Sequence, residues 1–194
     1  MPTPTTDRPE VDLPQKDRYT YADYQQLPEG APYELIHGHL VMSPSPTVQH
    51  QRLVRKLSRA LDDHVQDSEV GGEVLFAPMD VHLSDETVVQ PDVLYLSPDR
   101  TDRIGDQDIE GAPDLVMEVV SPSTSHRDVF DKKHLYETHS VREYWIVEPD
   151  SKTVEVHTLT DEAYTLHQRC VEEGTAASAL LDDFTINLPL LFEG

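Results

Sequence analysis

The chain has 194 residues, of which 15 are Lys or Arg and 37 are Asp or Glu, so its formal net charge is −22. This length suits one domain of ordinary size, which buries roughly 70% of the surface of its unfolded chain. Composition alone argues against a nucleic-acid binder, because a strongly acidic surface repels phosphate polymers.

Membrane and disulfide features are missing from the sequence. No apolar run approaches the roughly 18 residues that a membrane span needs, and the first residues show no secretory signal. A single cysteine, Cys170, excludes an internal disulfide and a zinc cluster built from cysteines. We therefore expect a cytoplasmic protein that does not associate with membranes.

The elements predicted at the N-terminal end are short. Residues 1–17 hold four prolines, charges and threonines without apolar periodicity, so we expect a disordered tail there and one domain over residues 18–194. Thr20 suits the N-cap of a short helix at Tyr21–Gln26. Two β-like runs then predict a hairpin that turns at Gly38: 33–36 and 39–42.

Residues 47–67 give the clearest helical pattern. The apolar face repeats at the helical period and consists of Leu53, Leu57, Ala60, Leu61 and His64. The opposite face carries Arg52, Arg55, Lys56 and Arg59. These basic residues are either the solvated side of an amphipathic helix, a contact for the phosphate backbone of a substrate, or partners of an acidic neighbour in a dimer.

The rest of the chain alternates short strands with one further helix. The polar, acidic stretch from Ser97 to Gly111 predicts a loop. Strands are predicted at 73–76, 79–83, 92–96, 114–120, 144–147 and 153–159, a helix at 127–138, and a last β-like pair at 163–168 and 184–188. Because both long helices lie between strands, we expect one mixed α/β (α+β) domain.

Two carboxylates interrupt otherwise apolar strands. Asp92 opens the run Val93–Leu96, and Glu118 lies within Leu115–Val120. Burying an unpaired carboxylate is costly, and two carboxylates on neighbouring strands can share a hard divalent cation. Each one alone is also explained as a solvated carboxylate at the end of a strand.

Five sequence blocks, in this order between Tyr21 and Leu159, resemble the Uma-type endonuclease family of the PD-(D/E)XK, restriction-endonuclease-like superfamily. The blocks are Tyr33-Glu34-Leu35-Ile36-x-Gly38, Gln90-Pro91-Asp92, Pro113-Asp114-Leu115-Val116-x-Glu118-Val119-x-Ser121-Pro122-Ser123, Asp128-x3-Lys132-x3-Tyr136 and Glu143-Tyr144-Trp145-Ile146-Val147. The resemblance implies a restriction-endonuclease-like core, which is a mixed central β-sheet flanked by helices, here with added β-hairpins.

The resemblance also implies a catalytic site. Asp92 matches the motif aspartate, Glu118 the second acidic metal ligand, and Glu34 an additional acidic group that lines the site. The superfamily's lysine is expected two residues after the second acid, where this chain has Val120. Lys132 on the following helix is the matching position for the catalytic lysine.

The resemblance further implies hydrolysis of phosphodiester bonds with Mg²⁺ or Mn²⁺, in nucleic acid and most simply in DNA. Such an ion activates a water molecule and polarises the phosphate. We expect Gln90 to contact site water or a ligand and Tyr136 to pack beside Lys132 or touch the substrate, with Arg52, Arg55, Lys56 and Arg59 as further substrate contacts. The superfamily's habits imply a homodimer. His50 either faces the site or caps its helix.

Two other functions remain open at this stage. A binding or scaffold module with a vestigial nuclease site would account for the acidic surface. A metal-dependent hydrolase of small phosphodiesters or nucleotides would fit the acidity better than one that acts on a long polymer. The 10 histidines form no HExxH or comparable zinc motif.

Overall fold

A computed structural model describes residues 15–120 and 126–193, apart from the side chains of residues 126–130. Residues 1–14 of the predicted tail and Ser121–Ser123 of the family motif lie outside the described residues, as does the side chain of Asp128. The disorder of the tail and the domain boundary at residue 17 therefore stay predictions.

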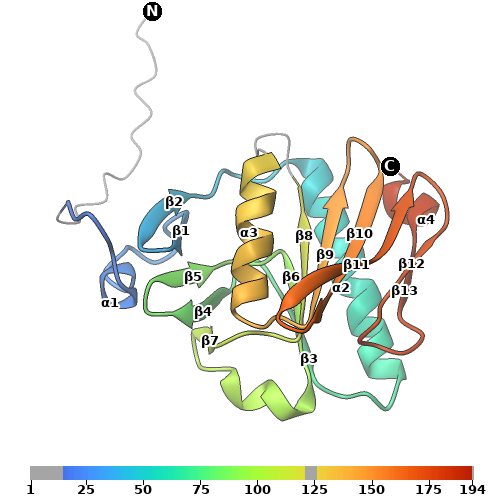
Figure 1. Cartoon of the computed structure of the whole chain (residues 1–194), viewed down its shortest axis with the longest axis horizontal. Coiled ribbons are helices and arrows are strands. Elements are labelled where there is room, and N and C mark those ends of the chain that lie inside the picture. Colours follow the sequence, from blue (N-terminus) through green and yellow to red (C-terminus); the bar gives the residue numbers. More distant parts are fainter. Residues whose placement is uncertain (1–14, 121–125, 194) are drawn as a thin grey trace, which may run out of the picture.

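A six-stranded mixed sheet in the order β11-β10-β9-β8-β6-β3 occupies the centre of the molecule (Figure 1). The neighbours β8 and β9 are parallel, and the other neighbouring pairs are antiparallel. The strands are β3 (Glu73–Phe76), β6 (Val93–Leu96), β8 (Leu115–Val119), β9 (Glu143–Glu148), β10 (Thr153–Thr160) and β11 (Ala163–Val171).

A second, five-stranded sheet in the order β2-β1-β5-β4-β7 lies beside the first (Figure 1). Its strands are β1 (Tyr33–Ile36), β2 (His39–Met42), β4 (Asp80–Ser84), β5 (Thr87–Val89) and β7 (Asp108–Glu110). The predicted hairpin is confirmed, and its turn places His37 and Gly38 at φ 50° and 78°, a conformation that glycine adopts without steric cost.

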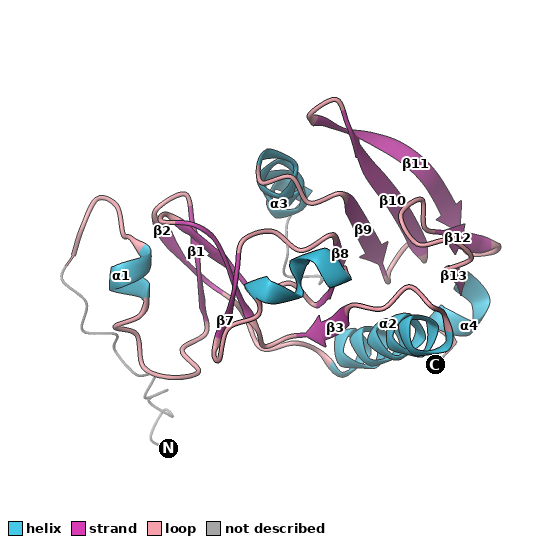
Figure 2. Ribbon diagram, turned by 90° about the horizontal axis from the view of Figure 1, so that it is seen from below, coloured by secondary structure: helices cyan, strands magenta, loops and turns pink. Residues whose placement is uncertain are grey.

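The two long helices cover opposite faces of the six-stranded sheet (Figure 2). Helix α2 (Val48–Asp67) begins after Thr47, whose hydroxyl accepts a hydrogen bond from the His50 backbone N–H. Its apolar stripe packs with one side of the sheet, while α3 (His126–Thr138) places Leu135 and Tyr136 on the other side. These layers form the cores that fix the site between them.

The remaining elements are short. Helix α1 (Tyr21–Tyr24) precedes the second sheet, and a 3₁₀-helix spans Pro98–Arg103. The C-terminal elements are β12 (Thr175–Ala177), β13 (Thr185–Asn187) and α4 (Leu188–Phe192). In the part of the chain described, no helix has the length and apolar character needed to cross a membrane.

The structure corrects three details of the predicted elements. Residues 97–111 are not loop throughout, because β7 pairs parallel to β4 and buries Ile109. The last predicted pair is also wrong: β11 pairs with β10, and β13 pairs with β12. Strand β5, which joins β1 to β4, was not predicted. The β4–β7 and β1–β5 pairings join segments that are distant in the chain, which local patterns do not record.

Candidate active site

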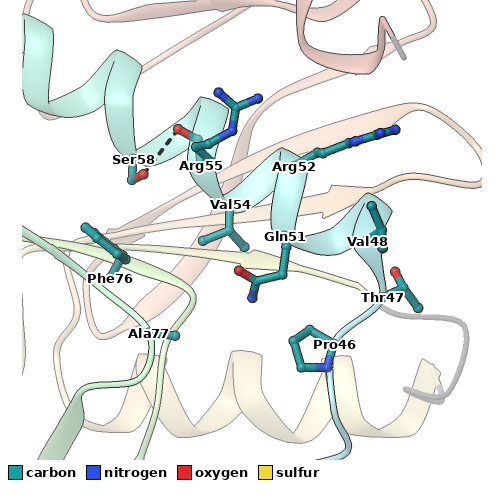
Figure 3. Close-up of a pocket in the computed structure, with 10 residues that line it drawn as sticks. All are labelled: Pro46, Thr47, Val48, Gln51, Arg52, Val54, Arg55, Ser58, Phe76 and Ala77. Carbon is teal, nitrogen blue, oxygen red and sulfur yellow. Dashed lines mark hydrogen bonds between the residues drawn. The ribbon is translucent and has the colours of Figure 1, made fainter.

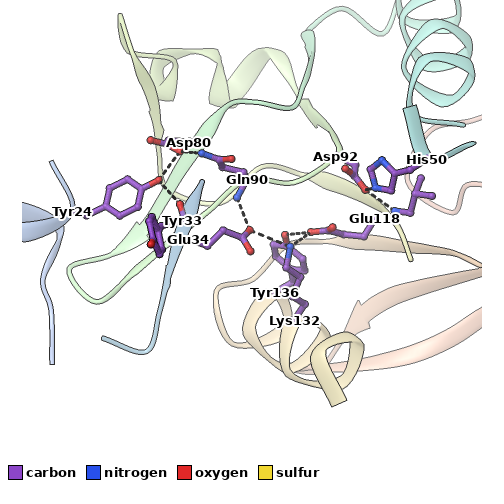
Figure 4. Close-up of polar contacts among 11 residues, drawn as sticks. Tyr24, Tyr33, Glu34, His50, Asp80, Gln90, Asp92, Glu118, Lys132 and Tyr136 are labelled. Carbon is purple, nitrogen blue, oxygen red and sulfur yellow. Dashed lines mark hydrogen bonds and ion pairs between the residues drawn. The ribbon is translucent and has the colours of Figure 1, made fainter. Parts of the chain in front are cut away.

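A cavity of about 530 Å³ lies where the two sheets meet α2 and α3. Its lining includes ionisable side chains from five separate parts of the fold that lie close together (Figure 4). They are Glu34 of β1, His50 of α2, Asp92 just before β6, Glu118 of β8 and Lys132 of α3. The acidic residues and the lysine that the sequence indicated as site residues therefore converge on one cavity.

The pleat of β8 aims Glu118 toward α3. Met117 and Val119 pack in the core that contains α2, and successive side chains of a strand point to opposite faces. Strand β6 is antiparallel to β8 with Val93 opposite Met117, so the register carried one residue further sets Asp92 opposite Glu118. The two carboxylates are neighbours because these strands pair directly.

Lys132 joins two carboxylates from different sheets. Its ammonium nitrogen Nζ lies 2.9 Å from Glu118 Oε1 and 3.1 Å from Glu34 Oε1. The hydroxyl of Tyr136, one helical turn later, donates to the same Glu118 oxygen at 2.6 Å. Tyr136 is fully buried and is not among the residues that line the cavity, so it holds Glu118 in place from behind.

Burial and charge set the protonation of this pair. Burial raises the pKa of Glu118 to about 7, and the charges of Asp92 and Glu34 add to the effect against the opposing charge of Lys132. Burial alone would lower the pKa of Lys132, but Glu118 and Glu34 outweigh it and hold that pKa well above its ordinary value. Lys132 is therefore a cation and a hydrogen-bond donor at neutral pH.

Asp92 is fixed by one of its two oxygens. Oδ2 accepts a hydrogen bond from the Val119 backbone N–H at 2.8 Å and lies 3.1 Å from His50 Nε2. Burial by itself would lower the pKa of His50. The hydrogen bond to Asp92 and the negative charge of Asp92 outweigh burial and raise that pKa. The structure thus places His50 at the cavity as a partner of Asp92.

A second row of polar groups supports Glu34 from the side of the five-stranded sheet. The backbone N–H of Gln90 donates to Glu34 Oε1 at 2.8 Å, and the Gln90 side-chain amide donates to Asp80 Oδ1 at 2.7 Å. The hydroxyl of Tyr24 donates to the same Asp80 oxygen at 3.0 Å (Figure 4). Sequence reasoning missed Tyr24 and Asp80, because no local pattern links residues so distant in the chain.

The four basic residues of α2 divide into two pairs. Lys56 donates to the backbone carbonyls of residues 190, 191 and 193, and Arg59 pairs with Asp63. Arg52 and Arg55 are exposed and line a second cavity next to the first. Within the described residues, neither guanidinium group has a hydrogen-bond or ion-pair partner, and the Ser58 hydroxyl donates only to the Arg55 backbone carbonyl.

The donor set at the cavity suits a hard divalent cation. Hydrogen bonds within the described residues engage Asp92 Oδ2 and Glu118 Oε1, and they leave Asp92 Oδ1 and Glu118 Oε2 without a partner there. Within the same residues, no group of three or more His, Cys, Asp or Glu side chains is arranged to hold an ion. Two carboxylates completed by water and phosphate are, however, the usual set for Mg²⁺.

A solved structure gives the class of fold. The crystal structure of "a putative nuclease belonging to DUF820" from Anabaena variabilis has a TM-score of 0.73 to this chain, with 20% identity over 89% of this chain and 97% of that one. The chain therefore has the mixed α+β, nuclease-like fold expected from its sequence.

The family follows from the sequence itself. Residues 21–189 match Uma2, described as "Putative restriction endonuclease", and the chain belongs to this family. The resemblance carried by the five sequence blocks is thereby confirmed. No curated protein matches the chain.

Proposed function

We propose that the protein is a Mg²⁺- or Mn²⁺-dependent nuclease that hydrolyses phosphodiester bonds, with Asp92 and Glu118 as metal ligands and Lys132 as the catalytic lysine. The observation that carries the proposal is the meeting of these three side chains at one cavity, although they come from three separate elements. Membership of the Uma2 family supports the same reaction class.

The bound cation would lower the pKa of a water nucleophile and neutralise charge on the phosphate. Asp92 Oδ1 and Glu118 Oε2 are the oxygens available for it, since the other oxygen of each carboxylate is held by protein hydrogen bonds. Those hydrogen bonds fix the orientation of both carboxylates, as partners of metal ligands commonly do.

Lys132 would act by donating hydrogen bonds, because the pKa raised by Glu118 and Glu34 keeps its ammonium protonated. An ammonium beside the scissile phosphate stabilises the negative charge that develops in the transition state. Glu34, which accepts from both Lys132 and the Gln90 backbone, would position this lysine. Gln90 lines the cavity and is a candidate for a contact with site water.

Cleavage assays on single- and double-stranded DNA and RNA, with Mn²⁺ or Mg²⁺ and with a chelator, test the proposal. We expect Asp92→Asn to abolish cleavage and Lys132→Met to reduce its rate by about 10²–10³. The matched control is Lys133→Met, which removes the same charge from the adjacent helical position but not from the cavity lining.

The outcomes separate the alternative functions. Cleavage that survives Asp92→Asn contradicts the assigned site. Hydrolysis of small phosphodiesters without hydrolysis of polymers indicates a small-molecule hydrolase. A binding or scaffold module is indicated if the unsubstituted protein hydrolyses none of these substrates and binds divalent cations no more tightly than Asp92→Asn does. Size-exclusion chromatography with light scattering measures whether the protein is the proposed homodimer.

A further inference from the structure

A groove of about 490 Å³ lies between α2 and the end of β3 (Figure 3). Four residues line both the groove and the active-site cavity: Pro46, Thr47, Gln51 and Ala77. The groove therefore lies directly beside the candidate active site, so a chain held in the groove would lie next to the cavity.

The groove combines an apolar floor with an exposed aromatic ring. Val54 points from α2 toward Ala77, and Phe76 stands at the side of the same space (Figure 3). The side chain of Phe76 is 58% exposed, although it belongs to β3 at the edge of the six-stranded sheet. An aromatic face left open in this way is suited to stack a planar, unpaired base.

The rim of the groove is basic, whereas the chain as a whole is acidic. Arg52 and Arg55 line it, and no acidic residue is among the described residues of its lining, whereas the chain carries −22. Both guanidinium groups extend outward from α2, away from the floor (Figure 3). This arrangement matches a strand whose bases face inward and whose phosphates lie at the rim.

We propose that this groove binds a single-stranded segment of nucleic acid, with one base stacked on Phe76 and the phosphates beside Arg52 and Arg55. The inference rests on the proposed nuclease function and names its substrate class. A duplex keeps its bases stacked inside, so it offers no free base to the apolar floor.

Binding of labelled oligonucleotides tests the proposal without cleavage. The experiment uses Lys132→Met protein in chelator and compares fluorescence anisotropy of one sequence as a single strand and as a duplex. We expect the single strand to bind more tightly, and Phe76→Ala to weaken its binding about tenfold. Phe76→Trp should keep the affinity, because it keeps a stacking face.

The dependence of binding on salt concentration tests the two arginines. Replacing Arg52 and Arg55 together by Gln should reduce the slope of log K against log salt by about 1.4, since each phosphate contact to a single strand contributes about 0.7. Arg59→Gln is the matched control, because this arginine is on the same helix but pairs with Asp63 outside the groove. Leu166→Ala, a 53% exposed apolar residue on β11, controls for Phe76→Ala.

Two results overturn the inference: unchanged single-strand affinity in Phe76→Ala, or equal affinity for duplex and single strand. Because Phe76, Arg52 and Arg55 are exposed, these variants should unfold at the temperature of the parent protein. Cleavage by the unsubstituted protein together with unaltered binding by the groove variants leaves the nuclease proposal standing and removes only the groove. If the groove variants alter binding as expected but the unsubstituted protein cleaves nothing, the groove proposal stands and the nuclease proposal falls.

Discussion

The ammonium of Lys132 on α3 lies 2.9 Å from a carboxylate oxygen of Glu118 on β8, in a part of the molecule where both side chains are largely buried. A charge in such a place depends on its partner, because removing one member leaves the other charge uncompensated. Glu34 contacts the same ammonium from the second sheet. Lys132 therefore has a structural consequence besides any part it takes in hydrolysis.

Lys132→Met should lower the free energy of unfolding by about 3 kcal/mol at pH 8 in the absence of metal. At pH 5 the loss should be smaller, because Glu118, with a pKa of about 7, is then protonated and leaves no uncompensated charge. Urea unfolding at both pH values measures the effect. Lys133→Met serves as the control, and equal losses in the two variants at pH 8 would contradict the ion pair's contribution.

Glu118 itself should make stability depend on pH. Its pKa is about 7 in the folded protein against 4.5 for the ordinary side chain, so the fold favours the protonated form. The stabilisation is complete below about pH 4.5 and is lost as the pH rises through 7. The free energy of unfolding of Glu118→Gln, taken relative to that of the parent protein, should therefore rise by about 3 kcal/mol as the pH increases from 4.5 to 8.

Unfolding of metal-free protein over this pH range measures that difference. Glu173→Gln, an exposed residue on the far end of the chain, should give a difference that does not change with pH. A flat difference for Glu118→Gln as well would show that Glu118 is ionised in the folded protein throughout the range.

Divalent binding should require both cavity carboxylates. Calorimetric titration of Mn²⁺ into the protein should give a binding isotherm that Asp92→Asn weakens at least about tenfold, because the substitution removes one of two charged oxygen ligands. Asp99→Asn removes an exposed carboxylate elsewhere and should leave the isotherm unchanged. The same affinity in Asp92→Asn would assign the ion to other oxygens.

The sequence predicted those parts of the site that follow from local pattern and family blocks. Asp92, Glu118 and Lys132 were indicated by acids in apolar runs and by matching positions, and the hairpin and α2 were indicated by periodicity. It did not predict that Tyr24 and Asp80 support Glu34 through Gln90, because that row joins segments that only the tertiary fold brings together.

The basic face of α2 shows the same limit. The four basic residues are equivalent in the sequence, but the structure pairs two of them. Backbone carbonyls near the C-terminus accept hydrogen bonds from Lys56, and Asp63 pairs with Arg59. Only the packing of the C-terminal segment against α2 decides which cations stay available to a substrate. The periodicity of one helix contains no information about that neighbour.

Glu143 should be essential for attaching the C-terminal segment to the sheet. It is fully buried in β9, and each of its oxygens accepts two hydrogen bonds. The donors are Trp145 Nε1 and Ser178 Oγ for Oε1, and the backbone N–H groups of Ala179 and Leu180 for Oε2.

Glu143→Gln keeps the shape but turns one acceptor into a donor, so it sets an NH₂ group against two hydrogen-bond donors around a buried side chain. We expect a loss of about 3 kcal/mol in the free energy of unfolding, measured by urea unfolding with the fluorescence of Trp145. Amide hydrogen exchange should become faster around residues 178–192 before the rest of the sheet, because these residues lose their anchor first. Glu110→Gln, at an exposed position of β7, should change neither measurement, and equal exchange in both variants would mean that other contacts hold the segment.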